Sequence, residues 1–135
     1  MMLYVNGQEI TRLVLGALKN EAWVIEPVDI PVPPEGYLAA IDAFLREHTL
    51  LRTSITTLVV VRGPGSATSL RTSLSIVNAW GFAQATTIIG IEKPRDEADV
   101  AVLARVRDAA ALSMVTPFYE RPAKITASTK DALGR

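Results

Sequence analysis

The segment that most constrains the fold is the run over residues 56–61, in which five of the six side chains are β-branched. Such residues favour strands, and a run that is apolar on both faces is typical of a central strand covered on both sides. A glycine-rich turn over residues 63–66 follows directly, then a helical apolar stripe over 69–83 and a second apolar strand over 86–91. This order predicts two parallel strands joined by a right-handed crossover helix.

The beginning of the chain predicts three further strands. A short apolar run at residues 3–5 is stopped by Asn6-Gly7, a pair that favours a tight hairpin turn because both residues tolerate positive φ. The second strand is expected over residues 11–18 and the third over 22–28. Pro27 cannot donate a backbone hydrogen bond, so we expect the third strand to lie at an edge of the sheet.

Two helices and a tail complete the expected fold. Apolar residues at three-to-four spacing predict a helix from Pro34 to about His48, with proline in its first turn. A second helical stretch is predicted over residues 100–114, and the polar residues 124–135 are expected to form a flexible tail. The chain is therefore predicted to be α/β, with a mixed five-stranded sheet, flanking helices, a C-terminal helix and a tail.

The charge balance argues against a nucleic-acid surface. The 135 residues include fourteen Lys and Arg against fourteen Asp and Glu, so no basic field attracts a phosphate backbone. The chain has no cysteine, which excludes disulfides and a thiolate nucleophile and favours a reducing compartment. No run is long and apolar enough to span a bilayer, and the first residues do not resemble a secretion signal. We expect a cytoplasmic protein that binds neither nucleic acid directly nor membrane.

The turn at residues 63–66 lies between a strand and a helix, as phosphate-binding loops do. A Walker A loop needs a lysine after its last glycine, where this chain has Ser66. A dinucleotide fingerprint is matched only in part, because Thr68 replaces its third glycine and Pro64 lacks a backbone donor. Glu92 ends the next strand, where a ribose ligand would lie. A structural role explains more, since Pro64 presets φ and Ser66 or Thr68 would cap the helix.

No catalytic or metal-binding constellation is expected. His48 is the only histidine and is predicted to end a helix, where a positive charge suits the helix dipole. No nucleophile elbow forms at Ser66, because the glycine required two residues later is missing. Asp96, Glu97 and Asp99 crowd the predicted start of the last helix, where negative charge complements the dipole. We therefore expect neither a cofactor nor a metal.

The helix over residues 69–83 is poor in long charged side chains. One side must pack on its own sheet through Leu70, Leu74 and Val77. The other side carries one charge, Arg71, whereas a solvated helix normally carries more Lys and Glu. The hydrophobic fraction of 49% is also slightly high for a small monomer. These features predict a second surface that faces a partner.

A longer motif carries a family resemblance. Residues 60–71 read VVRGPGSATSLR. This segment resembles the signature of the TsaB (YeaZ) family, in which a strand runs into Gly-Pro-Gly-Ser-Phe-Thr-Gly-Leu-Arg and then a small-residue helix. The matching positions are Gly63, Pro64, Gly65, Ser66, Thr68, Leu70 and Arg71. A weaker similarity lies at residues 117–122, PFYERP, which resemble the family's C-terminal Pro-x-Tyr-x-Arg ending.

The resemblance implies a single ribonuclease H-like/actin-like ATPase lobe. It divides the chain into a TsaB-like N-terminal lobe over residues 1–93, a C-terminal helix and packing segment over 94–123, and the tail over 124–135. The chain is too short for the second lobe of ordinary members. We therefore expect a shortened form, in which the cleft between lobes that binds nucleotide in relatives does not exist within one chain.

For function, the resemblance implies a non-catalytic scaffold. TsaB-type proteins bind the catalytic subunit TsaD through helices of this lobe, with the ATPase TsaE as a further partner. They support threonylcarbamoyladenosine formation at position 37 of tRNA, and alone they self-associate through the same surface. Carried over to this chain, the contact helix is 69–83, with the helix over 35–48 beside it and Arg71 as its polar anchor.

The resemblance also implies a set of partner-binding residues on that helix. They are Ser69, Leu70, Arg71, Ser73, Leu74, Val77, Asn78, Trp80 and Gly81. A charged residue introduced at Ser73 or Ala79 is expected to abolish association without unfolding the chain.

Two other hypotheses stay open. In the first hypothesis, the chain is a small nucleotide- or dinucleotide-binding enzyme that uses the turn at residues 63–66, with Glu92 bound to the ribose. Alternatively, it is a degenerate, homodimeric TsaB-like protein whose partner is something other than TsaD.

Overall fold

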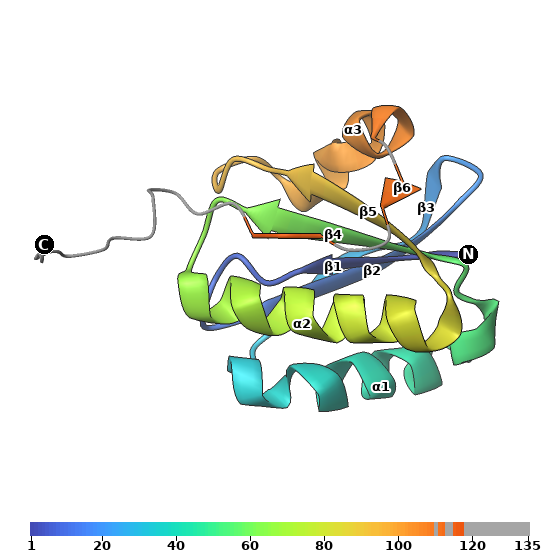
Figure 1. Cartoon of the computed structure of the whole chain (residues 1–135), viewed down its shortest axis with the longest axis horizontal. Coiled ribbons are helices and arrows are strands. Elements are labelled where there is room, and N and C mark those ends of the chain that lie inside the picture. Colours follow the sequence, from blue (N-terminus) through green and yellow to red (C-terminus); the bar gives the residue numbers. More distant parts are fainter. Residues whose placement is uncertain (110, 113–114, 118–135) are drawn as a thin grey trace, which may run out of the picture.

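A mixed sheet forms the centre of the computed structural model, which describes residues 1–109, 111–112 and 115–117 (Figure 1). The strand order is β3-β2-β1-β4-β5-β6. The bounds are β1 Met2–Asn6, β2 Leu13–Lys19, β3 Ala22–Ile30, β4 Thr57–Gly63, β5 Thr87–Glu92 and β6 Ala111–Leu112. Strands β1, β4 and β5 run parallel, while β2, β3 and β6 are antiparallel to their neighbours. The five predicted strands and the parallel crossover are confirmed, and β6 is an addition.

Helices cover both faces of this sheet (Figure 1). Helices α1 (Tyr37–Glu47) and α2 (Ala67–Gln84) lie side by side on one face. The short helices η3 (Asp99–Val102) and α3 (Leu103–Asp108) lie on the other. The 3₁₀ turns η1 (Pro34–Gly36) and η2 (Arg52–Ser54) precede α1 and β4. Among the described helices, none combines the length and the apolar character needed to cross a bilayer.

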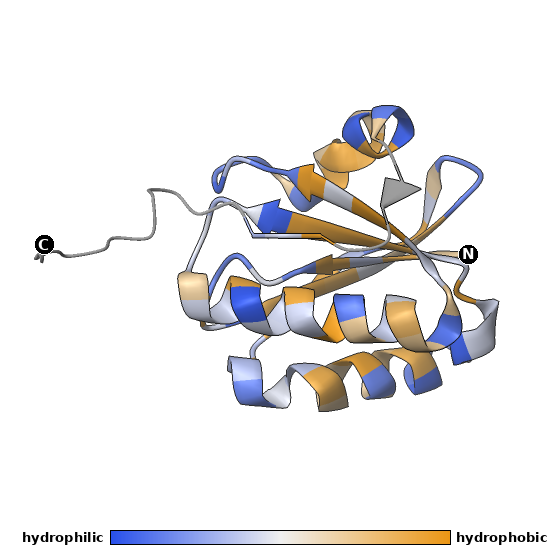
Figure 2. Cartoon of the chain, in the orientation of Figure 1, coloured by the Kyte–Doolittle hydropathy of each residue, from blue (hydrophilic) through white to orange (hydrophobic). Residues whose placement is uncertain are grey.

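The central strand β4 contributes to two cores, one on each face of the sheet. Leu58 and Val60 pack toward α1 and α2, whereas Val59 and Val61 pack toward α3, and all four are fully buried. Figure 2 shows mainly apolar residues along β4 and β5, and a mixture of apolar and polar residues along the helices. The β-branched run therefore does what its composition predicts, because each side chain along a central strand meets a packed layer.

The predicted tight hairpin at Asn6-Gly7 is wrong. Strand β1 ends at Asn6, but β2 begins only at Leu13, so the connection covers residues 7–12. The reason lies in Gln8, which turns inward and is 3% exposed, with its side chain bonded to the ends of other strands. The dipeptide begins a longer loop instead of a two-residue turn.

The edge position predicted for β3 is confirmed, and the edge is irregular. Strand β3 pairs only with β2, and the register shifts between Leu15 and Leu18 mark a β-bulge. Pro27 lies in the middle of the strand. Both features interrupt the row of backbone groups that an edge strand presents.

The helix predicted over residues 100–114 is wrong in its second half. Helix α3 ends at Asp108, and Ala109 adopts an extended conformation with ψ of 147°. The chain then re-enters the sheet as β6, where Ala111 pairs with Ile89 of β5. The open edge of β5 offers backbone partners that continued helix could not satisfy. The expected tail over 124–135 and the family-like residues after Pro117 lie outside the described residues.

Candidate functional site

The glycine turn joins β4 to α2 and packs on the loop after β1. Gly63 has a φ of 142°, which favours glycine, and the Gly63–Pro64 peptide bond is cis. The backbone N–H of Ser66 donates to the carbonyl of Gln8 at 2.9 Å. A Cβ on Gly65 would lie 2.7 Å from that same carbonyl oxygen, so glycine is required for the close approach. Ser66 stands at the N-cap of α2 without a side-chain cap bond, so the predicted capping role is wrong.

The carboxyl ends of the three parallel strands meet beside this turn, where Gln8 joins two of them. Its Nε2 donates to the carbonyl oxygens of Pro64 at 2.7 Å and Lys93 at 2.6 Å. Its Oε1 accepts from Asn6 Nδ2 at 3.0 Å, and its backbone N–H donates to Asn6 Oδ1 at 2.9 Å. Asn6 and Gln8 are 4% and 3% exposed, so these bonds satisfy buried polar groups.

Two further side chains close the same end. Asp99 Oδ1 accepts from the Tyr4 hydroxyl at 2.6 Å and from Asn6 Nδ2 at 2.7 Å. Burial, with the neighbouring Asp99 carboxylate, raises the pKa of Tyr4 well above its ordinary value. The ammonium of Lys93, a residue 2% exposed, donates to the carbonyls of Pro94 at 3.0 Å and Glu97 at 2.6 Å. We call Asn6, Gln8, Lys93 and Asp99 the end cluster.

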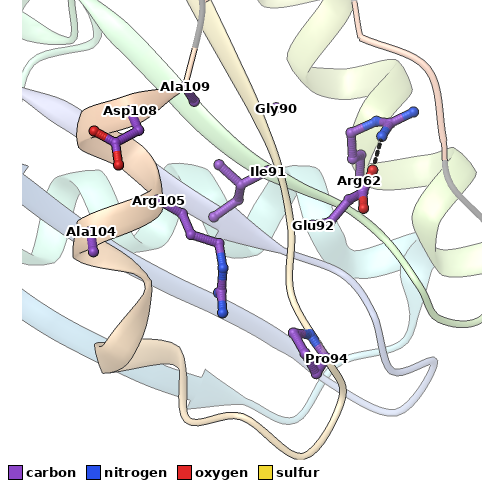
Figure 3. A pocket seen from close by; sticks show the side chains of 9 residues that line it. All are labelled: Arg62, Gly90, Ile91, Glu92, Pro94, Ala104, Arg105, Asp108 and Ala109. Carbon is purple, nitrogen blue, oxygen red and sulfur yellow. Dashed lines mark hydrogen bonds and ion pairs between the residues drawn. The ribbon is translucent and has the colours of Figure 1, made fainter.

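Two ion pairs lie near this end of the sheet. A pocket of about 600 Å³ lies beside β5. Figure 3 shows Arg62 and Glu92 on one side of this strand and Arg105 on the side of α3. Arg62 is ion-paired with Glu92. Arg105 binds Glu97 through two hydrogen bonds of 2.5 and 2.8 Å, which lower the pKa of Glu97. Asp99 lies in the first turn of η3, as expected, and also accepts the bonds from β1, whereas Glu97 precedes that helix and pairs with Arg105.

Six of the nine predicted partner-binding residues are buried within this chain. They are Ser69, Leu70, Ser73, Leu74, Val77 and Gly81. These residues face the sheet and the loop that follows β1. At Gly7 the helix comes so close that a Cβ on this residue would lie only 2.9 Å from Ser73 Oγ. A partner cannot contact these side chains while α2 stays on its sheet. A charged substitution at Ser73 therefore does not test docking, and the substitution must be made at an exposed position of α2 instead.

Asn78 serves the chain itself. Its side chain grips the backbone of Val115, donating to the carbonyl at 2.9 Å and accepting from the N–H at 2.9 Å. Val115 is buried against Gly90, where a Cβ would lie 2.5 Å from Val115 Cγ2. Asn78 thus fixes the segment at 115–117 beside α2.

The outer face of α2 is exposed and nearly uncharged. Arg71 is the only charged residue among the 18 of the helix. Ser75, Ala79 and Phe82 follow it at helical spacing on the exposed side, and Phe82 is 91% exposed. A Phe side chain so far in solvent is unusual, because its burial would contribute about 1.5–3 kcal/mol. We call Arg71, Ser75, Ala79 and Phe82 the α2 face.

A groove between α1 and α2 adjoins this face. It encloses about 880 Å³ and is lined by apolar side chains of both helices, including Leu38, Ile76 and Trp80. Leu38 is 64% exposed. The guanidinium of Arg52 lies 5.8 Å from the centre of the Trp80 ring, and the buried indole N–H of Trp80 has no acceptor among the described residues. We call this hollow the α1–α2 groove.

Helix α1 differs from α2 in its outer surface. It carries Asp42, Arg46 and Glu47 within 11 residues. Asp42 pairs with Arg46 at 3.1 Å, a spacing of four residues that suits exposed helices. His48 caps the end of this helix, as predicted, and its ring lies 4.6 Å from that of Phe44. The outer surface of α1 is therefore that of a solvated helix, apart from Leu38.

Comparison with solved structures identifies the fold. YeaZ from Pseudomonas aeruginosa superposes with a TM-score of 0.57 and 17% identity over 67% of this chain. The chain has a YeaZ-like fold. A second Pseudomonas aeruginosa protein, described as similar to peptidase YeaZ, matches with the same TM-score and identity. The match spans only 43% of the YeaZ chain, so this chain corresponds to less than half of it.

A second solved structure with a similar fold is that of a different protein. RuvC of Thermus thermophilus, solved in complex with a Holliday junction substrate, matches with a TM-score of 0.51 and 14% identity. The match covers 82% of this chain and 98% of RuvC. The fold is thus ribonuclease H-like/actin-like, as predicted. No protein-family model and no curated protein sequence matches the chain.

Fold alone does not choose between such relatives, so function must be argued from side chains. The sequence also raised a nucleotide as a ligand of the turn at residues 63–66. Several donors beside this turn are already bonded within the chain, because Gln8 and Lys93 bind backbone carbonyls and the Ser66 N–H binds the Gln8 carbonyl. Glu92, the expected ribose ligand, is ion-paired with Arg62. No group of acidic or histidine residues in the described ranges is arranged to hold a metal ion.

Sequence reasoning missed the end cluster. Its members are separated by up to 93 positions and each has an ordinary local meaning, such as a turn residue or a dipole partner. One signal was present: Asn6 and Lys93 both stand at or just after the end of an apolar strand. Because parallel strands end at the same edge of a sheet, polar residues at such positions meet.

Proposed function

We propose that the chain is a non-catalytic, cytoplasmic partner subunit for threonylcarbamoyladenosine modification of tRNA at position 37. It binds a TsaD-type catalytic subunit through the α2 face and the α1–α2 groove. The observation that carries the proposal is a long helix that bears one charge and exposes Phe82 on its outer side. A TsaE-type ATPase is a further candidate partner, and the chain itself makes no direct contact with tRNA.

The composition of the surface supports a protein partner. Interface cores are depleted in charge and enriched in aromatic residues and arginine. The α2 face has this composition, with Phe82 as an aromatic anchor and Arg71 as a bidentate donor for a partner carboxylate. The small residues Ser75 and Ala79 between them allow the backbone of a partner helix to come close.

The signature residues support the same proposal through their structural role. Gly63 and Gly65 let the turn close onto the loop after β1, and Leu70 is buried on the side of α2 that faces the sheet. These positions set the height and direction of α2 on the sheet. A motif that places a helix is what a docking subunit needs, and it supports the family resemblance without a phosphate site.

The test is co-purification with the cognate TsaD-type subunit from cells that express both. We expect Phe82→Asp and Ala79→Glu to weaken the complex at least about tenfold, because each buries a charge at the centre of the interface. Val28→Asp is the matched control, since Val28 is also an exposed apolar residue, at 40%, but lies on β3. All three variants should melt within a few degrees of the unmodified chain.

The same variants separate the alternatives. If the chain associates with itself but not with the TsaD-type subunit, and Phe82→Asp abolishes that association, the degenerate homodimer hypothesis replaces the proposal. If Phe82→Asp binds the TsaD-type subunit as tightly as Val28→Asp does, the α2 face is not the docking surface. Light scattering of the isolated chain and a pull-down supply both readouts.

A further inference from the structure

The end cluster lies at the place where open α/β sheets usually bind ligands. Ligands of such sheets bind beyond the carboxyl ends of the parallel strands. Here those ends are Asn6, Gly63 and Glu92 of β1, β4 and β5. The space beyond them is filled by Asn6, Gln8 and Lys93, which are 2–4% exposed, and by the half-buried Asp99.

Lys93 is bonded to three separate segments. Its backbone N–H donates to the carbonyl of Gly63 at 3.0 Å, and its carbonyl accepts from Gln8 Nε2 at 2.6 Å. Its ammonium then holds the carbonyls of Pro94 and Glu97 in the next turn. A buried ammonium is costly unless its donors are used. Lys93 therefore ties the end of β4 and the loop after β1 to the segment that follows β5.

The segment after Lys93 is held at two more points. Asp99 accepts hydrogen bonds from Tyr4 and Asn6 of β1. The indole N–H of Trp23, on β3, donates to the carbonyl of Val100 at 3.0 Å. The segment from Lys93 to Val100 is thus fastened across the sheet from its parallel centre to its antiparallel edge.

We propose that the end cluster is a built-in latch that takes the place of a ligand at this end of the sheet. Lys93 makes the bridging contacts between segments at the place where open α/β sheets usually hold a ligand. The latch holds η3 and α3 on the face of the sheet opposite to α2. It is a positioning device, and it uses the side-chain donors of Gln8 and Lys93 within the chain.

Trp23 provides a local reporter of the latch. In a Trp80→Phe background, which removes the only other tryptophan, fluorescence comes from Trp23 alone. We expect Lys93→Met to raise acrylamide quenching of Trp23 at least about twofold, because the segment at 93–100 then opens locally. Lys19→Met is the matched control, since Lys19 is an exposed lysine at the end of β2, and it should leave quenching unchanged.

A second measurement needs no variant. In the unmodified chain, the latch predicts that the backbone N–H of Lys93 and the indole N–H of Trp23 exchange with solvent at similar rates, as one opening unit. Mg²⁺ with ATP, titrated to millimolar concentration, should cause no saturable change in the resonances of residues 6–8 and 93–99.

Three results would overturn the proposal. The first is a Lys93→Met chain that folds and keeps Trp23 as protected as Lys19→Met does. The second is protection of the Lys93 N–H while the Trp23 indole exchanges freely. The third is saturable binding of Mg²⁺ with ATP that perturbs residues 6–8. None of these depends on a TsaD-type partner, so the latch and the docking surface can fail separately.

Discussion

One turn, at residues 63–66, connects the end cluster to the α2 face, but the two regions differ in how far their side chains are buried. In the end cluster, Gln8 and Lys93 are almost fully buried, and their donors are bonded within the chain. On the α2 face, Phe82 is almost fully exposed. A region with satisfied polar groups has little to gain from a ligand, whereas exposed apolar surface gains from a partner. The contrast supports the proposal that docking uses the helices instead of the strand ends.

The sharpest test of this contrast compares two serines of α2. Ser73 is fully buried and Ser75 is exposed, although they are two residues apart. We expect Ser73→Asp to lower the free energy of unfolding by about 3–5 kcal/mol, because it leaves a buried charge without a partner. Ser75→Asp should change it by less than about 0.5 kcal/mol while weakening docking. Urea denaturation followed by circular dichroism measures both, and equal stabilities would erase the boundary between the two sides of α2.

The second test concerns Tyr4, which lies beside the end cluster, at alkaline pH. The raised pKa of Tyr4 means that the folded chain keeps this proton above pH 10.0, where an unfolded tyrosine loses it. Stability contributed by Tyr4 is therefore fully present below pH 10.0 and falls as the pH rises further. Tyr4→Phe should reduce this slope by about 1.4 kcal/mol per pH unit.

Tyr37 remains in that variant as an internal reference, since burial raises its pKa as well. Denaturation curves between neutral pH and pH 11 give the slope for each chain. An unchanged slope in Tyr4→Phe would mean that the hydroxyl is open to water and that the end of the sheet is less closed than described.

The smallest expected effect is at the exposed Glu97–Arg105 pair beside the end cluster. The hydrogen bonds from Arg105 lower the pKa of Glu97, so the stability from this pair is present above the ordinary pKa of 4.5 and is lost as the pH falls. Glu97→Gln should remove no more than about 0.5 kcal/mol at neutral pH, because the pair is exposed and screened by solvent. Acid unfolding at low and high salt measures this difference. A decrease of several kcal/mol in the free energy of unfolding would mean that the pair is shielded from solvent like the end cluster.

The sequence was sufficient for the order of the elements. The β-branched run at β4 and the apolar stripe of α2 carry their periodicity openly, so strands, crossover and edge were predicted close to their observed bounds. The second half of the helix expected over 100–114 failed because the free edge of β5 recruits Ala111 and Leu112. Sheet edges are a tertiary property that local periodicity does not contain.

The helix predicted to face a partner is the one that carries the α2 face, but six of its nine predicted contact residues are buried within the chain. Leu70, Leu74 and Val77 mark the core side of α2, yet small residues such as Ser69 and Ser73 are equally compatible with either side. Only the close approach allowed by Gly7 shows that they face inward. Phe82 was overlooked because a single aromatic residue near a helix end is usually buried.

The irregular edge of the sheet limits how this protein can assemble. A bulge and Pro27 interrupt β3, and at the far side of the described sheet β6 is only two residues long. Neither border is a good template for a strand of another molecule. Growth by adding strands, the route to continuous intermolecular sheets and aggregates, is therefore discouraged. This border chemistry agrees with the proposed docking through helices, a mode of packing that can be reversible and selective.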